Sequence, residues 1–521
     1  MTYTFNLIEK PWIPCVMLDG RTVELGLRET LARAREIREI RDASPLVTAG
    51  LHRLLLAILH RNFGPVTPED WLAIWQNGRG MWDMTKLDTY LARWHERFDL
   101  FHPEQPFYQV ANFTTNRVSP ISRLYHELTS GNNPTLFDHS VDEAPPAIRP
   151  GEAARILVAH QAFAIGGGRS FTGYTVHSPL IGGVIVLFQG DTLFETLMLN
   201  FIAYNPEDNE PLAVVSGRPD LPAWEREEAI SPGEKRRVFG YLDLLTWQSR
   251  AIRLLPEGDP GQPHISSLYY AQGEGCAEEL VFDPQVPMIK DREGALTKLR
   301  LNPDRALWRD STALMNRTST VSQPVKACNW LAQLMEYHQA LDENKEYRLN
   351  VYGLATDQAK ILLWREEELP LPVRYLKDPE LTNILAKELE KAEGGARAIS
   401  DALYTLALHL LYPEDEMRAK GVDQKKVRAM TNEFSAPLLY WSKMELHFHE
   451  LIRGLVRNRR EASLIWLRSI KREARGAFDE TIRGLGRSAR VLKASIRGQA
   501  ALNGSLARHV GMEEEVLMDA G

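Results

Sequence analysis

The residue types that perform catalysis are present in this sequence, but they do not form a recognisable catalytic pattern. His447 and His449 stand two positions apart on a predicted helix, so their side chains point to different faces and are poor partners for one metal ion. His52 and His60 lie eight positions apart on a helix of core type, which is typical of structural histidines. HExxH, GxSxG and Walker motifs are missing. We therefore predict no catalytic residue, no metal site and no cofactor.

Cysteine usage and hydropathy limit the class of protein further. The three cysteines, Cys15, Cys276 and Cys328, lie far apart without a CxxC pair, which argues against a zinc site and a disulfide framework. The longest apolar stretches, such as residues 54–59 and 184–188, are too short to span a bilayer. The first residues lack the pattern of a secretory signal. We expect a cytoplasmic protein without a membrane partner.

A polar tip between two apolar runs is the most informative local pattern. It lies in Val351–Pro372, VYGLATDQAKILLWREEELPLP. Residues 347–352, before the tip, and residues 361–364, after it, are mostly apolar. This pattern predicts a strand, a polar tip and a second strand, with Thr356, Asp357 and Gln358 at the tip. The amide of Gln358 both donates and accepts hydrogen bonds, so it can address the edge of a base. An ordinary hairpin turn is the alternative interpretation.

Three consecutive glycines, Gly166, Gly167 and Gly168, follow a predicted helix. Without Cβ atoms the main chain can approach another surface closely, for example the groove of a duplex. The segment is not a phosphate-binding P-loop, because no GK[ST] follows. A flexible turn remains the alternative.

A polar loop at residues 130–139 carries one apolar pair. Its candidate contact residues are Asn132, Asn133, Leu136, Phe137 and Asp138. An aromatic ring in such a loop can stack on a base, or it can pack back into the core as an anchor.

Basic charge is concentrated near the C-terminus, although the net charge of the chain is −7. Residues 453–508 contain 14 Lys and Arg against 4 Asp and Glu, a local balance of +10. Helical spacing places one group of these basic residues on a single face of one predicted helix. We assign a second group of basic residues to the next helix. The first is Arg468, Lys471, Arg472 and Arg475, and the second includes Arg483, Arg487 and Arg490. Like charges at this spacing repel, which favours an anionic partner such as a phosphate backbone over a merely solvated face.

The elements that position these residues change in type along the chain. Strands are predicted at residues 4–7 and 22–25, and helices at 45–62, from 67, at 153–164 and at 192–204. After about residue 378 only helical pattern occurs, at 378–394 and 397–412 (one helix or two, divided at Gly394-Gly395), 424–455, 460–484 and 487–508. The prediction is an α+β protein: a large mixed α/β domain over residues 1–374, then a C-terminal four-helix bundle over 375–521.

Several longer segments resemble the CasA family, the large subunits of the type I-E CRISPR surveillance complex Cascade. They are FNLIEKPWIPC, ASPLVTAGLHRLLLAILHRNFGP, FDLFHPEQPFYQV, SGNNPTLFDH, GGGRSFTGYTVHSP, RALWRDSTALM and the tip segment. They occur in the family's order and cover nearly the whole chain.

The resemblance implies a non-catalytic subunit that detects the protospacer-adjacent motif on double-stranded target DNA through the minor groove and helps to open the duplex. It implies two kinds of protein partner, the Cascade subunits that contain the guide RNA and a helicase–nuclease that is recruited later. A metal-dependent nuclease with an unrecognised active site is the alternative.

The resemblance also suggests roles for individual residues. Gln358, beside Asp357, matches a wedge, Gly166 to Gly168 match a loop that contacts the motif, and Lys290 is the candidate for a groove lysine. Residues 136–138 match a loop that anchors the subunit on the complex, although the family's aromatic stands one place earlier than Phe137. The basic helix faces would hold DNA phosphates.

Overall fold

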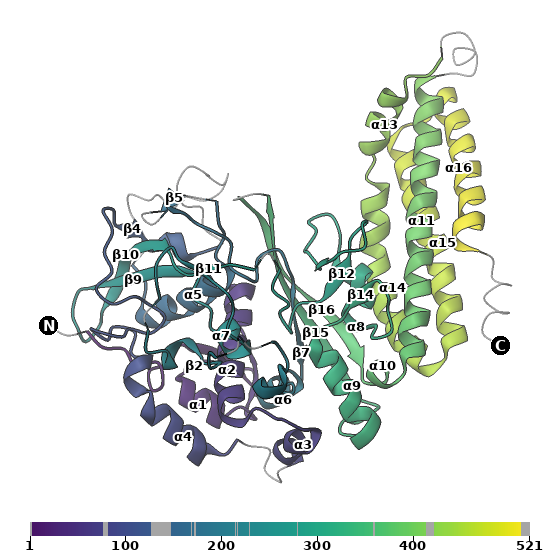
Figure 1. The fold of residues 1–521 in the computed structure, drawn as a ribbon. Coiled ribbons are helices and arrows are strands. Elements are labelled where there is room, and N and C mark those ends of the chain that lie inside the picture. The colour runs from purple at the N-terminus through teal and green to yellow at the C-terminus, as the bar shows by residue number, and fades with distance from the viewer. Residues whose placement is uncertain are drawn as a thin grey trace. The chain divides into compact units, whose positions relative to one another are not determined.

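The computed structural model describes residues 3–76, 82–126, 147–167, 169–170, 173–213, 215, 217–228, 230–278, 280–357, 360–412 and 421–511. The chain forms two compact units (Figure 1). The first comprises residues 1–307, 313–342 and 347–368, and the second comprises 308–312, 343–346 and 369–521. Two short segments from the middle of the chain therefore belong to the same unit as the C-terminal helices.

The first unit mixes helices with short strands, which confirms the predicted fold class. Its helices are α1 (Leu27–Ala32), α2 (Pro45–Phe63), α3 (Pro68–Gln76), α4 (Met84–Arg93), α5 (Pro150–Phe163), α6 (Leu193–Leu199), α7 (Tyr241–Leu245) and α9 (Lys326–His338), while α8 (Ser311–Met315) has residues in both units. Short 3-10 turns are η1 (His95–Phe98), η2 (Ile121–Leu124), η3 (Pro206–Asp208), η4 (Ala223–Glu225) and η5 (Leu307–Asp310).

The strands form several small sheets, most of them antiparallel. The sheet orders are β2 (Thr22–Leu25), β1 (Ile13–Met17), β3 (Ile37–Ile40); β4 (Ser119–Pro120), β10 (His264–Gln272), β9 (Arg250–Glu257); β13 (Leu296–Lys298), β12 (Met288–Lys290), β14 (Ser322–Gln323); and β16 (Lys360–Pro372), β15 (Glu346–Asp357), β7 (Ile185–Gln189). Two-stranded pairs are β5 (Arg169–Ser170) with β6 (Gly173–Tyr174), and β8 (Lys235–Arg236) with β11 (Gly275–Cys276).

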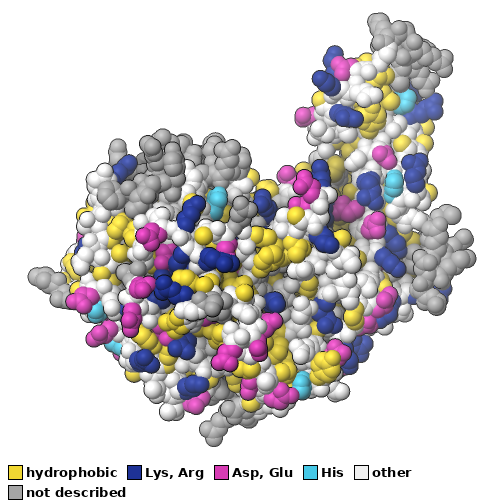
Figure 2. All heavy atoms as spheres, in the orientation of Figure 1, with side chains coloured by type: hydrophobic (Ala, Val, Ile, Leu, Met, Phe, Trp, Pro, Cys, Tyr) yellow, Lys and Arg dark blue, Asp and Glu magenta, His cyan; other side chains and the backbone are white. Residues whose placement is uncertain are grey.

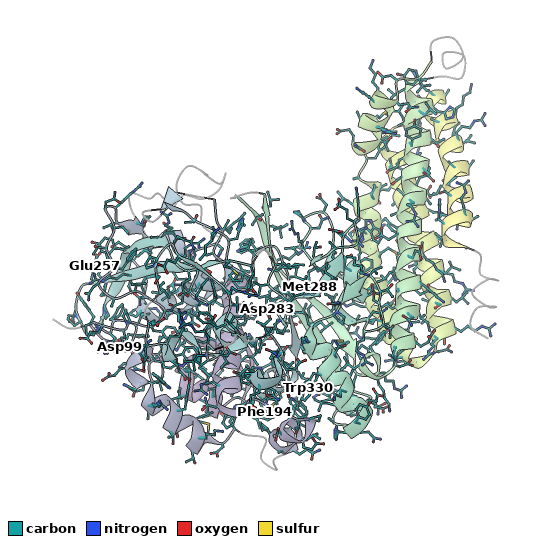
Figure 3. The ribbon with its side chains drawn as sticks, viewed as in Figure 1. Asp99, Phe194, Glu257, Asp283, Met288 and Trp330 are labelled. Carbon is teal, nitrogen blue, oxygen red and sulfur yellow. The ribbon has the colours of Figure 1, made fainter. Side chains whose placement is uncertain are left out.

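Helix α2 forms the centre of the first unit. The sequence predicts one buried face for this helix, but nearly all of its residues are buried, including Arg53. The Arg53 guanidinium is 2.9 Å from the carboxylate of Asp283, a residue labelled in Figure 3, and it also donates to Gln285. Because this charge is paired inside the core, the helix can be surrounded on all sides.

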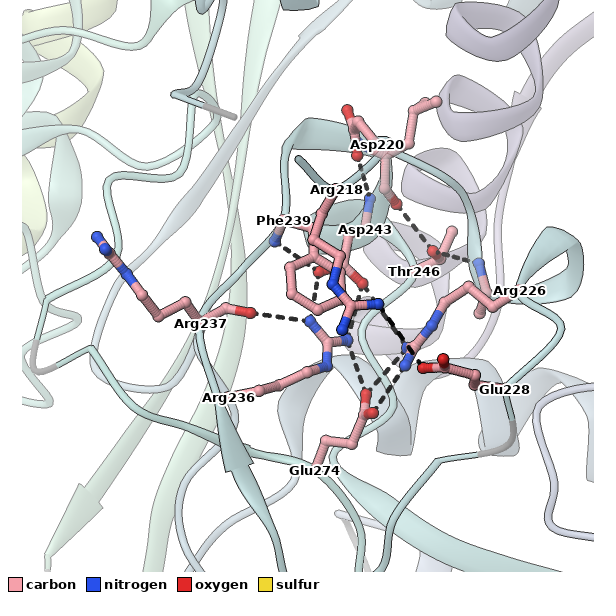
Figure 4. Close-up of polar contacts among 12 residues, drawn as sticks. Arg218, Asp220, Arg226, Glu228, Arg236, Arg237, Phe239, Asp243, Thr246 and Glu274 are labelled. Carbon is pink, nitrogen blue, oxygen red and sulfur yellow. Dashed lines mark hydrogen bonds and ion pairs between the residues drawn. The ribbon is translucent and has the colours of Figure 1, made fainter. Parts of the chain in front are cut away.

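A buried network of ion pairs holds a long irregular segment onto the first unit (Figure 4). Arg236 donates to Asp243 at 2.6 Å and to Glu274 at 2.7 Å, and Arg226 binds the same Glu274 at 2.8 Å. Asp220 caps α7 by accepting from two of its backbone N–H groups. Two arginines thus face two carboxylates, so the charges balance where the segment carries little regular structure.

The second unit is a bundle of long helices, as predicted. They are α11 (Pro379–Leu411), α14 (Ala436–Arg457), α15 (Arg459–Gly484) and α16 (Ala489–Val510), with the shorter α10 (Arg374–Lys377) and α13 (Gln424–Asn432). Gly394 and Gly395 do not divide α11. A Cβ atom on Gly394 would lie 2.5 Å from the carbonyl oxygen of His509, and one on Gly395 would lie 2.5 Å from the Tyr440 hydroxyl. These glycines therefore allow close helix packing and do not end a helix.

Three further expectations differ from the structure. Residues 4–7 form no strand, because Asn6 makes an isolated bridge and turns its side chain to the backbone of Ile8 and His95. Helix α6 ends at Leu199, earlier than predicted. The predicted helix 424–455 is interrupted after Asn432, and α14 begins anew with a proline in its first turn. None of the helices in the described ranges is long and apolar enough to cross a membrane.

Candidate nucleic-acid interface

The glycine-rich turn is a hairpin whose backbone requires glycine. At its base the Ser178 N–H donates to the Ala164 carbonyl, and further out the Gly167 N–H donates to the Thr175 carbonyl, both at 2.9 Å. A Cβ atom on Gly166 would lie 2.5 Å from the backbone of Val176. Gly167 has a φ of 116°, which favours glycine. The backbone of the turn itself thus requires glycine at both positions. Gly168 lies outside the described residues.

The hairpin that carries the predicted tip consists of β15 and β16, which pair with each other and, through β15, with β7. Its strands are longer than the apolar runs in the sequence indicate. Asp357 is the last residue of β15, and the predicted wedge residue Gln358 lies outside the described residues. The free end of this hairpin and β5 both lie toward the upper side of the first unit in the view of Figure 1.

Lys290 ends strand β12, and its side chain is exposed. The strand pairs with β13 through a turn in which Asp291 accepts from the backbone of Glu293 and Ala295. The Lys290 backbone N–H donates to Val321 at 2.8 Å. The lysine thus stands at the edge of a short hairpin with its ammonium group in solvent.

One hydrophobic cluster holds the roots of all three segments. We call it the root cluster, and Met288 within it is labelled in Figure 3. Its members from these segments are Phe163, Ile165 and Leu180 beside the glycines, Tyr352, Leu354 and Ile361 in the β15–β16 hairpin, and Met288 and Leu296 beside Lys290. Side chains in such a core are closely packed and hold fixed positions. The structure thus brings the bases of the three segments together, although they are far apart in the sequence.

His177 sets the electrostatics at the base of the glycine turn. The Gly166 N–H donates to its Nδ1 at 3.1 Å, which requires that this nitrogen carries no proton. Burial and then the nearby charge of Arg250 lower the pKa of His177. This shift favours the neutral imidazole, which is the form that can accept the hydrogen bond.

The predicted basic faces of the bundle are largely exposed, but they are not free of partners. Arg468, Arg472 and Arg475 are exposed and Lys471 is half-buried. Arg472 is 2.7 Å from Glu473 and also meets His447. Figure 2 shows lysines and arginines interspersed with acidic side chains on the visible face of this unit. Part of the local charge is thus neutralised within the bundle.

The second basic group differs from its predicted placement on one helix. Arg483 lies in the last turn of α15, Arg487 lies in the connection, and Arg490 lies at the start of α16. Arg490 donates to the Leu411 carbonyl at 2.9 Å. The group therefore surrounds a helix–helix turn at one end of the bundle.

Other predicted residues fall outside the part of the chain that the structure describes. They are the complex-anchoring residues Asn132, Asn133, Leu136, Phe137 and Asp138, within residues 127–146. Among the described residues, no group of three or more His, Cys, Asp or Glu side chains could hold a metal ion. Sequence reasoning did not single out Arg250, Gln272 or His177, because no local pattern marks them and their partners are distant in sequence.

Comparison with known proteins agrees with the resemblance seen in the sequence. The family model described as CRISPR-associated protein Cse1 matches residues 6–477. The CRISPR-associated protein CasA/Cse1 of Thermus thermophilus is 38% identical over 502 residues, which are 95% of this chain and 96% of the relative.

Solved structures share the fold over nearly the whole chain. The structure of Thermus thermophilus CasA (Cse1) matches with a TM-score of 0.81 and 31% identity, covering 97% of this chain and 100% of that one. A chain of a CRISPR RNA-guided surveillance complex matches in fold, with a TM-score of 0.74 at 22% identity over 96% of this chain and 100% of its own. The family model and the high coverage lead to one conclusion: this chain belongs to the CRISPR-associated Cse1 family, whose members are also called CasA.

Proposed function

We propose that this chain is the large, non-catalytic subunit of a CRISPR RNA-guided surveillance complex of the Cascade type. In this role it recognises the protospacer-adjacent motif on double-stranded target DNA through the minor groove, and it helps to open the duplex for pairing with the guide RNA. It then recruits the helicase–nuclease that degrades the target. The cytoplasm, which holds guide RNA and invading DNA, is the expected location.

The observation that carries this proposal is the root cluster. A glycine turn, a hairpin with a polar tip and a hairpin ending in an exposed lysine start from one packed core. Reading a short motif needs backbone that approaches the groove, a polar side chain for base edges and a cation for phosphates. The three segments offer these three kinds of contact from neighbouring roots.

The physical chemistry of the groove fits a subunit of this kind. The minor groove mainly distinguishes A·T from G·C pairs, so contacts there tolerate several motifs. Sequence identity can be left to the guide RNA, which leaves the protein only a short motif to check. Inserting a side chain between base pairs costs a few kcal/mol of stacking, which contacts to the distorted duplex offset. Gln358 could act in this way without burying a charge.

Replacing Gln358 by alanine tests the wedge. In the reconstituted complex, Gln358→Ala should slow R-loop formation by about tenfold, equivalent to about 1.4 kcal/mol, while initial binding to duplex DNA changes little. Thr356→Ala, two positions earlier in the same polar tip, is the matched control, because it removes a polar side chain without changing Gln358. R-loop rates at the wild-type level in the Gln358 variant would remove this residue from the opening step.

The non-catalytic role has its own test. The pure chain is incubated with double-stranded and single-stranded DNA and with Mg²⁺ or Mn²⁺, and the products are separated on a gel. We expect intact DNA. Cleavage that increases with protein concentration and disappears on chelation would instead favour a metal-dependent nuclease.

A further inference from the structure

Arg250, at the start of β9, is fully buried, and all five of its N–H groups are used. Nε donates to the Tyr270 hydroxyl at 2.9 Å, and Nη1 donates to the Ser249 carbonyl at 2.8 Å and to Gln272 at 3.2 Å. Nη2 donates to the carbonyls of Ile165 and Val176 at 2.8 and 2.9 Å. Every one of these acceptors is neutral.

The last two contacts connect the arginine to the segments on both sides of the glycine turn. Ile165 immediately precedes Gly166, and Val176 lies in the segment that follows β6. The Val176 N–H in turn donates to the Gln272 side chain at 2.7 Å. Arg250 and Gln272 face each other across β9 and β10, so together they bind both backbone groups of Val176. The side chains of Arg250 and Gln272 thus make the two hydrogen bonds to the Val176 backbone that a neighbouring strand would make in a sheet.

A buried charge without a carboxylate is costly, and this cost calls for an explanation. The core of the same unit contains Arg53, which has an acidic partner, Asp283. A buried cation with only neutral acceptors loses hydration that dipoles compensate only in part. What an arginine offers here is a rigid planar guanidinium whose three nitrogens reach five acceptors at once, which the single nitrogen of a lysine cannot match.

We propose that Arg250, assisted by Gln272, is a positioning residue that holds the glycine turn in the backbone conformation needed for motif recognition. This inference rests on the proposed function and adds to it the device that presents Gly166 and Gly167. The Arg250 charge, after burial, also lowers the pKa of His177, which favours the neutral form that accepts the Gly166 N–H. The backbone at residues 165, 166 and 176 is thereby held in place before DNA binds, which reduces the entropy lost on binding.

The test compares two buried arginines. Arg250→Lys keeps the positive charge but removes the planar guanidinium that binds the backbone on both sides of the turn. Arg53→Lys is the matched control, because the hydrogen bonds of Arg53 go to Asp283, Gln285 and the Leu244 carbonyl. Amide hydrogen exchange of peptides spanning residues 164–178 is measured in the full chain. Motif discrimination, the ratio of Kd values for DNA without and with the motif, is measured in the reconstituted complex.

Arg250→Lys should raise exchange at 164–178 and reduce motif discrimination, each by about tenfold, while affinity for motif-free DNA stays within about twofold of wild type. Arg53→Lys should not raise exchange at residues 164–178 above that of the rest of the chain, and it should leave motif discrimination unchanged. Wild-type exchange or full discrimination in folded Arg250→Lys would overturn the inference. If that variant does not fold, Gln272→Met decides through the same two measurements.

Failure of the inference differs from failure of the proposed function. If wild type discriminates motifs and Gly167→Ala loses discrimination while Arg250→Lys keeps it, only the role of Arg250 is wrong. If the wild-type complex does not discriminate motifs, the proposed function and the inference are both wrong.

Discussion

His60 is a buried histidine surrounded by aromatic rings. Its ring centroid lies 4.6 Å from that of Phe201, 5.2 Å from that of Tyr241 and 5.7 Å from that of Tyr204. Neither ring nitrogen has a hydrogen-bond partner within the described residues. Burial lowers the pKa of His60 to about 3, so the folded protein holds it neutral. Acid therefore charges this side chain much more readily in the unfolded chain.

The pH dependence of stability follows from this shift. Between pH 6.5 and about 3 the unfolded state binds the proton and the folded state does not. The contribution of His60 to the free energy of unfolding is therefore fully present above pH 6.5, and it falls by about 1.4 kcal/mol per pH unit as the pH decreases toward about 3. His60→Phe should make the fall shallower, as measured by urea unfolding at a series of pH values. If the free energy of unfolding falls with the same slope against pH in the variant and in wild type, His60 is not the source of this pH dependence.

Residues without a local pattern are the ones that the sequence does not reveal. Gly167 stands out because three glycines in a row are visible in any sequence. Arg250 does not, because one arginine at a strand end has no distinguishing neighbours, and its two carbonyl partners beside the glycine turn lie 74 and 85 positions away. Chemistry that depends on such distant pairs appears only once the chain is folded.

At the scale of elements, glycines in the long helices occupy two different kinds of position. Gly395 in α11 faces the Tyr440 hydroxyl and Ile470, and a Cβ atom would lie 2.5 and 2.7 Å from them. Gly504 in α16 has no heavy atom within 4 Å of such a Cβ among the described residues. The first position is set by packing, while the second only carries the entropic cost of glycine in a helix.

A pair of alanine substitutions distinguishes the closely packed position from the open one. Gly395→Ala should destabilise the second unit by about 1–3 kcal/mol, because the neighbouring helices must shift. Gly504→Ala should stabilise it by about 0.5–1 kcal/mol. Thermal melting of the two variants beside wild type measures both effects. Stabilisation by Gly395→Ala would mean that α11 tolerates a wider spacing to α14 and α15.

Periodicity predicts the elements better than it predicts their ends. The stripe in α2, the tip between β15 and β16, and the four long helices are all visible as patterns. The residues at 394–395 are ambiguous in the sequence, because glycine permits both a helix end and a close contact. Residues 4–7 have a strand-like composition, yet the side-chain bonds of Asn6 bind the backbone differently. Tertiary contacts decide each of these cases.

At the scale of the whole molecule, charge is unevenly distributed, with a balance of +10 over residues 453–508 in a chain of net charge −7. Replacing Lys471, Arg472 and Arg475 by glutamine should reduce affinity for DNA with and without the motif about equally. The salt slope of log Kd should flatten by up to about 0.9 for each phosphate that these side chains no longer neutralise. Filter binding from low to high salt measures this slope.

A matched control removes three charges from the same unit. Lys425, Lys426 and Arg428 are exposed on α13, and their replacement by glutamine should leave the slope closer to that of wild type. Equal slopes in the Lys471, Arg472 and Arg475 variant and in wild type would show that this face meets protein and not DNA. Motif discrimination should survive in both variants, since phosphate contacts carry no sequence information.

The second unit contains Trp308, which is buried and stacks on Phe448 of α14 at a centroid distance of 5.0 Å. Beside it, Arg309 lies over the Trp441 ring and binds Glu393 of α11. During synthesis this tryptophan leaves the ribosome well before its partners, by on the order of ten seconds at ordinary translation rates. The bundle cannot complete its core on the nascent chain until α14 emerges, so Trp308 lacks its stacking partner Phe448 for that time.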